Sequence, residues 1–225
     1  DGSTANIASA VREATQLASL QHPNIVTIHD FLKSGDDLLV VMEYISGQNI
    51  DQLDGPMPVD FFIDFARQCL NALGAAHSAG IVHRDIKAGN IMLARLPSGD
   101  FQVKLLDFGL AKAQPEPMLQ TMDQSGAVLG SIFTMAPEQF NCLPLDQRTD
   151  LYSLGCVFYQ ALTATRPFQG KTSANVIAAH LQNDFIPLSS LRPDIPLGIC
   201  TWVERFIACD PANRPPSASA AANDL

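Results

Sequence analysis

The residues best suited to chemistry lie in one short stretch, Ile81-Val82-His83-Arg84-Asp85-Ile86-Lys87-Ala88-Gly89-Asn90. Its last six residues carry the carboxylate of Asp85, the ammonium group of Lys87 and the carboxamide of Asn90. Asp85 can accept a proton, Lys87 can neutralise a moving negative charge, and Asn90 can offer its carbonyl oxygen to a hard cation. Together these groups indicate chemistry on phosphates.

A second carboxylate follows a predicted strand. The run Val103-Lys104-Leu105-Leu106, predicted to be a strand, leads directly into Asp107-Phe108-Gly109. Because hard cations prefer oxygen ligands, a carboxylate at the end of a strand is a candidate metal ligand.

Hydrophobic periodicity predicts the elements that precede the Asp85 stretch. A helix is expected at 8–20, and Pro23 ends it. Strands at 25–28 and 38–44, joined by a polar turn at 33–37, predict an antiparallel hairpin. A helix at 60–79, stopped by Gly80, then leads into the stretch, and its His77 is interpreted as a core or helix-end residue without a chemical role.

Further elements follow the stretch. A short hairpin is predicted from strands at 91–94 and 103–106. The run from Asp150 to Phe158 is almost unbroken in apolarity, so it predicts a helix buried on most sides, with Asp150 as its cap. Helices at 174–182 and 198–209 complete the pattern.

The motifs resemble those of protein kinases. The Asp85 stretch resembles the catalytic loop H-R-D-x-K-x-x-N, and Asp107-Phe108-Gly109 resembles the magnesium-binding motif of the same family. The irregular segment 108–137 resembles an activation segment. Its end, 130–138, matches the family pattern in outline, with Ser131 in place of threonine and Thr134 in place of the usual aromatic residue. Lys87 favours the Ser/Thr branch over tyrosine kinases, and the style of the second half is bacterial.

The resemblance implies an α+β, bilobal fold with a mainly helical large lobe and a truncated β small lobe. Residues 1–43 are then expected to form the partial small lobe, and residues 44–225 the large lobe. The implied function is transfer of the γ-phosphate of ATP, with Mg²⁺, to Ser or Thr hydroxyls of a protein substrate.

The resemblance also implies roles for individual residues. Asp85 orients the substrate hydroxyl and accepts its proton, Lys87 balances charge, and Asn90 and Asp107 hold the metal. Met42 is the expected gatekeeper residue beside the adenine, and residues 43–45 form the hinge between the lobes. The implied nucleotide-binding residues are Met42, Glu43, Ile45, Met92, Lys87, Asn90 and Asp107.

A further group of residues has structural or regulatory roles by resemblance. Glu13 takes the position of the glutamate of the small-lobe helix, and Asp150 holds the catalytic-loop backbone. Arg214 forms a buried bidentate ion pair with Glu138. Phe108 joins an apolar stack between the lobes that also contains Leu17, Ile28 and His83. Arg84 is expected to bind a phosphate placed on Thr121 or Ser125 of the activation segment.

Two parts of the family pattern are missing from the sequence. None of the 14 glycines forms Gly-x-Gly, and no lysine precedes Lys33, so the phosphate-covering loop and the lysine partner of Glu13 are absent. The favoured interpretation is a fragment of a longer active kinase. The alternative is a catalytically deficient pseudokinase that acts as a regulator or scaffold, and a third class is a pure peptide-binding module.

The composition restricts the remaining possibilities. With 225 residues, 47% of them hydrophobic, the chain can bury a sizeable core. A net charge of −9 argues against nucleic acid or an anionic membrane surface as the main partner. Five widely spaced cysteines indicate neither a disulfide framework nor a zinc site and favour a cytoplasmic location. No apolar run approaches the ~20 residues needed to cross a bilayer.

Overall fold

A computed structural model describes residues 20–34, 37–108 and 131–225. Its strands are β1 (Ile28–Ser34), β2 (Asp37–Met42), β3 (Gly47–Asn49), β4 (Ile91–Arg95) and β5 (Phe101–Leu105). Its α-helices are α2 (Val59–Ser78), α4 (Pro137–Phe140), α5 (Gln147–Thr163), α6 (Ser173–Gln182), α7 (Leu188–Leu191), α8 (Leu197–Phe206) and α9 (Ala218–Asn223). Short 3₁₀ helices lie at η1 (Ile50–Gln52), η2 (Ala88–Asn90) and η3 (Pro211–Asn213).

The first sheet is the predicted antiparallel hairpin of β1 and β2. The prediction that its first strand covers 25–28 was wrong, because β1 begins at Ile28. The backbone just before it is used elsewhere: the Val26 N–H donates to the Leu105 carbonyl at 2.9 Å, and the Leu105 N–H donates to the Asn24 carbonyl at 2.9 Å. These bonds connect the segment before the hairpin to β5.

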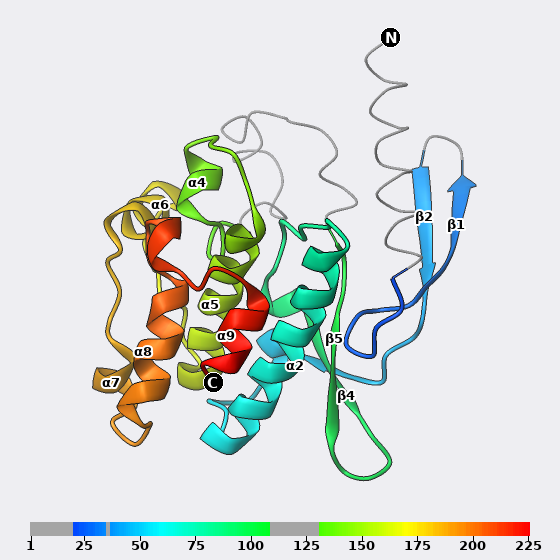
Figure 1. The fold of residues 1–225 in the computed structure, drawn as a ribbon, viewed down its shortest axis with the longest axis horizontal. Coiled ribbons are helices and arrows are strands. Elements are labelled where there is room, and N and C mark those ends of the chain that lie inside the picture. The colour runs from blue at the N-terminus through cyan, green and yellow to red at the C-terminus, as the bar shows by residue number, and fades with distance from the viewer. Residues whose placement is uncertain (1–19, 35–36, 109–130) are drawn as a thin grey trace.

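The second sheet has the strand order β3-β4-β5, and both pairs are antiparallel. The hairpin of β4 and β5 was predicted, and it extends beyond the helices in Figure 1. Strand β3 was not predicted, because its three residues, Gly47–Asn49, carry no strand-forming side chains. The β4–β5 hairpin places η2 at its start and Asp107 just after its end.

The helices pack around α5. Thirteen of its seventeen residues are buried, which confirms the predicted helix with few exposed sides. It contacts α2 and α8, and α2 also contacts α9 and β5 (Figure 1). Phe158 of α5 lies edge-on to Phe62 of α2, with ring centroids 5.4 Å apart, and stacks on Trp202 of α8 at 5.6 Å. This aromatic cluster fixes α5 relative to its neighbours.

The ends of the two long helices are set by local chemistry. Gly80 has φ of 76°, a left-handed conformation that glycine adopts without strain, so the chain turns there after α2. At the start of α5 the cap is Asp146, whose side chain accepts the N–H of Arg148 at 2.8 Å. The prediction that Asp150 caps this helix was therefore wrong, because Asp150 lies one turn further along.

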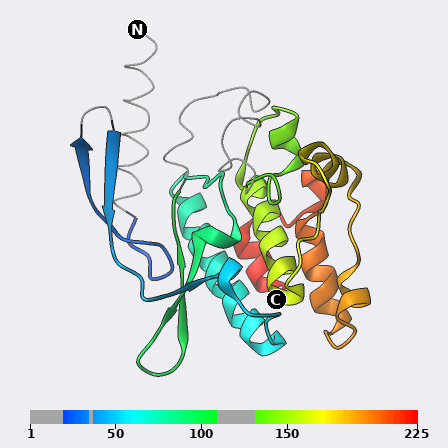
Figure 2. The same ribbon diagram turned by 180° about the vertical axis from the view of Figure 1, so that it is seen from behind.

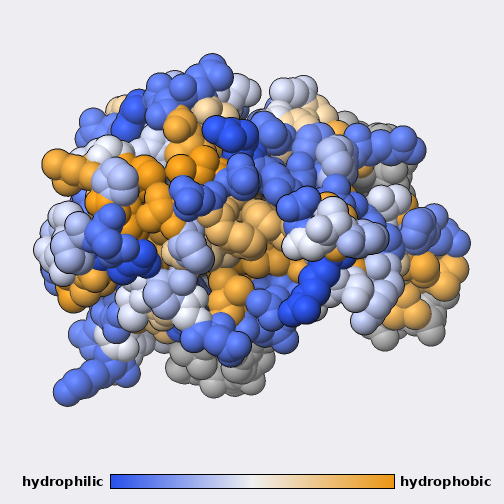
Figure 3. All heavy atoms as spheres, turned by 90° about the horizontal axis from the view of Figure 1, so that it is seen from below, coloured by the Kyte–Doolittle hydropathy of each residue, from blue (hydrophilic) through white to orange (hydrophobic). Residues whose placement is uncertain are grey.

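Figure 2, seen from behind, agrees with Figure 1 that the β1–β2 hairpin lies to one side of the helices. The division into residues 1–43 and 44–225 stays a prediction. On the face seen in Figure 3, hydrophobic residues gather between hydrophilic ones. Among the described residues, no helix combines the length and the apolarity that crossing a bilayer requires.

Candidate active site

The backbone of the loop before Asp85 is held by one buried carboxylate. Asp150, in the first turn of α5, accepts the N–H of His83 through Oδ2 and the N–H of Arg84 through Oδ1, both at 2.8 Å. His77 Nε2 also donates to Asp150 Oδ2 at 2.8 Å. Arg84 has φ of 63°, a left-handed conformation that costs free energy in a non-glycine residue. The two bonds to Asp150 offset that cost and fix the direction in which the chain enters Asp85.

The three predicted catalytic side chains meet. Lys87 Nζ lies 2.8 Å from Asp85 Oδ2, and Asn90 Nδ2 donates to the Asp85 carbonyl at 3.0 Å and to Oδ2 at 3.3 Å. The Ser131 hydroxyl donates to the other carboxylate oxygen, Oδ1, at 3.0 Å. Asp85 thus has a cation and an amide on one oxygen and an alcohol on the other.

The Asp107 motif is tied to the same loop. The Leu106 N–H donates to the Asn90 carbonyl at 2.9 Å, so the residue before Asp107 is hydrogen-bonded to the second predicted metal ligand. Asp107 itself is exposed and has φ of 50°. Phe108 is buried against His83, with ring centroids 4.4 Å apart. The structure therefore brings the two candidate metal ligands, Asn90 and Asp107, to the open end of the β4–β5 hairpin.

His83 supports this arrangement as a neutral ring. Its Nε2 donates to the Leu106 carbonyl at 2.8 Å, and its Nδ1 accepts the Asp85 N–H at 3.3 Å. Nδ1 can accept only when it carries no proton. Burial lowers the pKa of His83, which keeps the ring in this neutral form.

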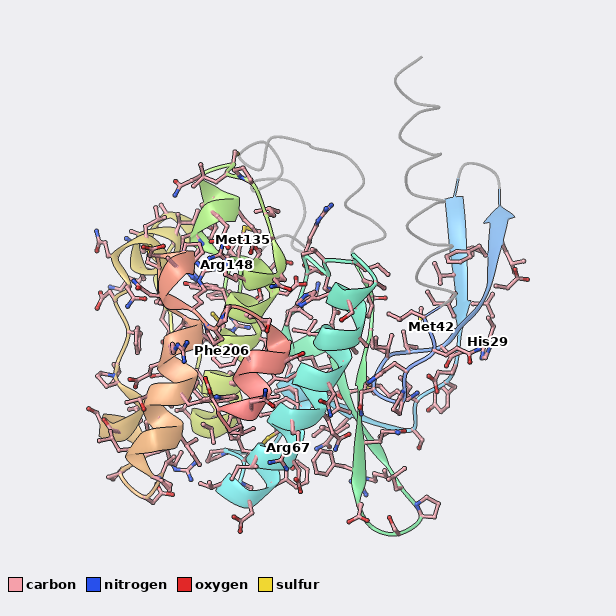
Figure 4. All side chains as sticks on the ribbon, viewed as in Figure 1. His29, Met42, Arg67, Met135, Arg148 and Phe206 are labelled. Atoms are coloured by element: carbon pink, nitrogen blue, oxygen red, sulfur yellow. The ribbon has the colours of Figure 1, made fainter. Side chains whose placement is uncertain are left out.

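The predicted nucleotide-binding residues lie on three separate segments. Met42 ends β2, Glu43 and Ile45 follow it, and Met92 lies on β4. All four are partly exposed, and Figure 4 shows Met42 at the β1–β2 hairpin. Their contact with a nucleotide stays a prediction.

Glu43 makes an ion pair that sequence reasoning missed. Its Oε1 lies 2.6 Å from Lys104 Nζ of β5 and accepts the N–H of Thr27 at 2.8 Å. Burial alone would raise the pKa of the Glu43 carboxyl, but the hydrogen bonds from Lys104 and Thr27 outweigh burial and lower it. Lys104 thereby connects the end of the β1–β2 hairpin to β5, the strand that leads to Asp107.

The expected ion pair between Arg214 and Glu138 is present and buried. Nη1 and Nη2 of Arg214 lie 2.7 and 2.9 Å from Oε1 and Oε2 of Glu138. The Arg214 side chain is 0% exposed and that of Glu138 is 6% exposed. Because Glu138 follows the segment that carries Ser131, this pair anchors that segment to the chain before α9.

Glu13, Thr121 and Ser125 lie outside the described residues, as does Leu17 of the expected apolar stack. Sequence reasoning did not assign Ser131 a contact with Asp85 and gave His77 no role. For Ser131 and His77 the sequence shows only a polar side chain near an apolar segment. Such a pattern does not identify a hydrogen-bond partner that is distant along the chain.

This chain resembles known proteins over most of its length. Residues 2–224 match the family model described as protein kinase domain. A probable serine/threonine-protein kinase of Clostridium acetobutylicum is 36% identical over 217 residues, which are 95% of this chain and 32% of that protein. The serine/threonine-protein kinase PknB of Mycobacterium leprae is 37% identical over 221 residues, 95% of this chain and 35% of that protein.

A solved structure, Rad53 1-466 in complex with AMP-PNP, is 27% identical with a TM-score of 0.77 and covers 95% of this chain and 53% of that one. The chain thus spans about a third of the length of these curated relatives. The predicted family and the kinase-like fold are confirmed. The chain belongs to the protein kinase domain family, and its curated relatives are serine/threonine-protein kinases of bacteria.

Proposed function

We propose that this domain transfers the γ-phosphoryl group of ATP to serine or threonine hydroxyls of protein substrates. The observation that carries the proposal is the surroundings of Asp85, whose carboxylate pairs with Lys87 on Oδ2 and accepts an alcohol hydrogen bond on Oδ1. A base for a substrate hydroxyl needs such an oxygen, and a travelling phosphoryl group needs such a cation.

Asp85 acts as the positioning base. Its Oδ1 accepts the Ser131 hydroxyl at 3.0 Å, which is within the range required for proton transfer from an alcohol. A substrate hydroxyl placed at the same carboxylate loses its proton to Asp85 as its oxygen bonds to the γ-phosphorus of ATP, and the bond from that phosphorus to the β-phosphate oxygen breaks, so that ADP leaves. Lys87 offsets the charge that develops on the phosphoryl oxygens. Because Asp150 and Asn90 hold the loop backbone, these groups stay in place during the reaction.

Asn90 and Asp107 suit a magnesium ion. Asn90 uses its amide nitrogen on Asp85, which leaves its carbonyl oxygen for a cation, and Asp107 offers an exposed carboxylate. Two oxygen donors match Mg²⁺, which is usually held by one or two protein oxygens together with substrate phosphates. When bound, the ion neutralises phosphate charge. The two residues would hold it beside the groups that orient the acceptor hydroxyl.

The likeness of this chain to Rad53, whose structure contains AMP-PNP, supports a nucleotide as the second substrate. The cytoplasmic location and the absence of nucleic acid partners stay predictions.

The test is Asp85→Asn in the full-length protein. This change keeps the shape of the side chain but removes the base, so we expect kcat to fall by about 10² to 10⁴-fold with a generic Ser/Thr substrate. Asp184→Asn is the matched control, since Asp184 is exposed and its side chain makes no hydrogen bond within the described residues. Comparable turnover of Asp85→Asn and wild type, at equal folded fraction, contradicts the proposal.

A further inference from the structure

A basic pocket lies beside the segment that carries Ser131. It has a volume of about 680 Å³ and is lined by Phe133, Thr165, Arg166, Gln169, Gly170 and Lys171. Phe133 comes from the segment that leads from Ser131 to α4, and the other five residues form the connection between α5 and α6.

Arg166 is held in position on one side of this pocket. Its guanidinium carbon lies 3.9 Å from the centroid of the Phe133 ring. A guanidinium can contact an aromatic ring through its face, which keeps the N–H groups at its edge available to an anion. None of these N–H groups donates to another group within the described residues. The side chain is therefore pre-organised for a bidentate anion, because little rotamer entropy remains to be lost.

The charge of the pocket differs from that of the whole chain. The chain carries a net charge of −9, yet two of the six lining residues are cationic and none is anionic. Neither Arg166 nor Lys171 forms an ion pair with a carboxylate in the part of the chain that the structure describes, whereas Arg148, Arg192 and Arg205 each pair with an aspartate. Within the described residues, the pocket thus presents two positive charges that no carboxylate pairs with, on an acidic protein.

The pocket is within reach of a peptide at Asp85. Ser131 donates to Asp85 and lies two residues before Phe133. With at most ~3.6 Å per residue, the guanidinium of Arg166 lies within about 20 Å of the Asp85 carboxylate. About six residues of extended peptide span that distance.

We propose that this pocket binds an acidic side chain, a carboxylate or a phosphate, of the protein substrate and so sets its specificity. The proposal rests on the proposed function, since the ligand is the peptide whose hydroxyl lies at Asp85. Arg166 binds the anion through two parallel N–H groups, and Lys171 adds a second positive charge.

The experiment uses full-length protein and a set of fluorescent peptides with one serine acceptor. A single aspartate is moved through every position within about six residues on either side of the serine, and a neutral peptide carries asparagine instead. Affinity is measured by fluorescence anisotropy, and kcat/KM by phosphate transfer. A second set with phosphoserine in place of aspartate distinguishes phosphate from carboxylate.

We expect aspartate at one or two adjacent positions to improve affinity by about three- to tenfold over the neutral peptide, since solvent in an open surface pocket screens the ion pair to roughly this effect. In the double variant Arg166→Gln/Lys171→Gln, the ratio of the affinities for the aspartate peptide and the neutral peptide should fall towards one. Arg205→Gln removes the same kind of charge outside the pocket and should keep the wild-type ratio. The preference should also weaken as salt rises.

A ratio near one in the wild type, a preference spread evenly over all positions, or a preference retained in the double variant overturns the proposal. The two readouts separate this result from the proposed function. Phosphate transfer without an acidic preference would refute only the pocket. Selective binding of one acidic peptide without transfer would support the pocket and refute the catalytic role.

Discussion

Replacing Arg214 with alanine should strongly destabilise the fold, because this one side chain supports several buried polar groups. Besides its two bonds to Glu138, it donates to the carbonyl oxygens of Ala208 at 2.8 Å, Arg148 at 3.0 Å and Cys209 at 2.9 Å. Its guanidinium carbon also lies 4.6 Å from the centroid of the Tyr152 ring. Five hydrogen bonds and a ring contact are lost together.

The magnitude follows from the charge that remains. Among the side chains that the structure describes, alanine leaves the buried Glu138 carboxylate with the Thr149 hydroxyl as its one donor, at 2.9 Å. Removing one partner of a buried ion pair costs about 3 to 5 kcal/mol of unfolding free energy. For a domain of this size that loss lowers Tm by roughly 6 to 20 °C.

The loss should depend on pH. Burial raises the pKa of Glu138, but the hydrogen bonds and charge of Arg214 outweigh burial and hold that pKa below its ordinary value. In the native protein the pair therefore stabilises the fold above the unfolded pKa of Glu138, and this contribution is lost as pH falls through the folded pKa. Without Arg214 the folded pKa rises above the unfolded one, so protonation relieves the buried charge. The destabilisation should be larger at pH 7 than at about pH 5.

Urea unfolding at both pH values measures these differences. Glu138→Ala and the double variant complete a mutant cycle that isolates the pair. We expect the double variant to remain less stable than the wild type, because the three carbonyl oxygens stay without their donor. An unchanged Tm for Arg214→Ala, or an equal loss at both pH values, would refute the reasoning.

Two further substitutions test how α5 supports the site. Asp150→Asn replaces one acceptor oxygen with a donor that faces backbone N–H groups, so we expect the free energy of unfolding to fall by about 1 to 3 kcal/mol. Below the melting range, kcat should fall roughly 10²-fold. Chemical denaturation and steady-state kinetics measure the two effects, and an unchanged kcat would contradict the prediction. Gly155→Ala places a methyl group against the Cβ of Phe206 and 3.0 Å from Ile207 Cγ2, so overpacking of about 1 to 3 kcal/mol should exceed the gain in helix propensity. Calorimetry measures the Tm of Gly155→Ala, and a Tm equal to or above that of the wild type would contradict the predicted destabilisation.

The parts of the fold that sequence predicted are those in which neighbouring residues carry the signal. The long helix at 60–79, observed as Val59–Ser78, and the hairpin of 91–94 and 103–106 follow from local periodicity and turn residues. The contact between Asp85, Lys87 and Asn90 was predictable for the same reason, since a loop of six residues brings these side chains together whatever surrounds it.

The parts that sequence did not predict depend on partners distant along the chain. His77 and Asp150 are 73 positions apart, and Glu43 and Lys104 are 61 apart. Each of these residues alone has the pattern of a surface or helix-end polar group. His77 meets Asp150 because α2 packs on α5, and Glu43 meets Lys104 because the end of the β1–β2 hairpin lies against β5. The N-cap was misplaced because Asp146 and Asp150 are both suitable caps, and tertiary contacts decide between them.

The position of Asp150 explains why a buried helix matters for chemistry at the surface. Arg84 and Asp107 both have left-handed backbone conformations, which the chain adopts only where surrounding bonds compensate the cost. For Arg84 that compensation comes from a carboxylate that is 1% exposed on α5, and α5 in turn is fixed by α2 and α8. The geometry around Asp85 is therefore set by packing in the core. Substitutions in α5 that move Asp150 should consequently lower kcat as well as the free energy of unfolding.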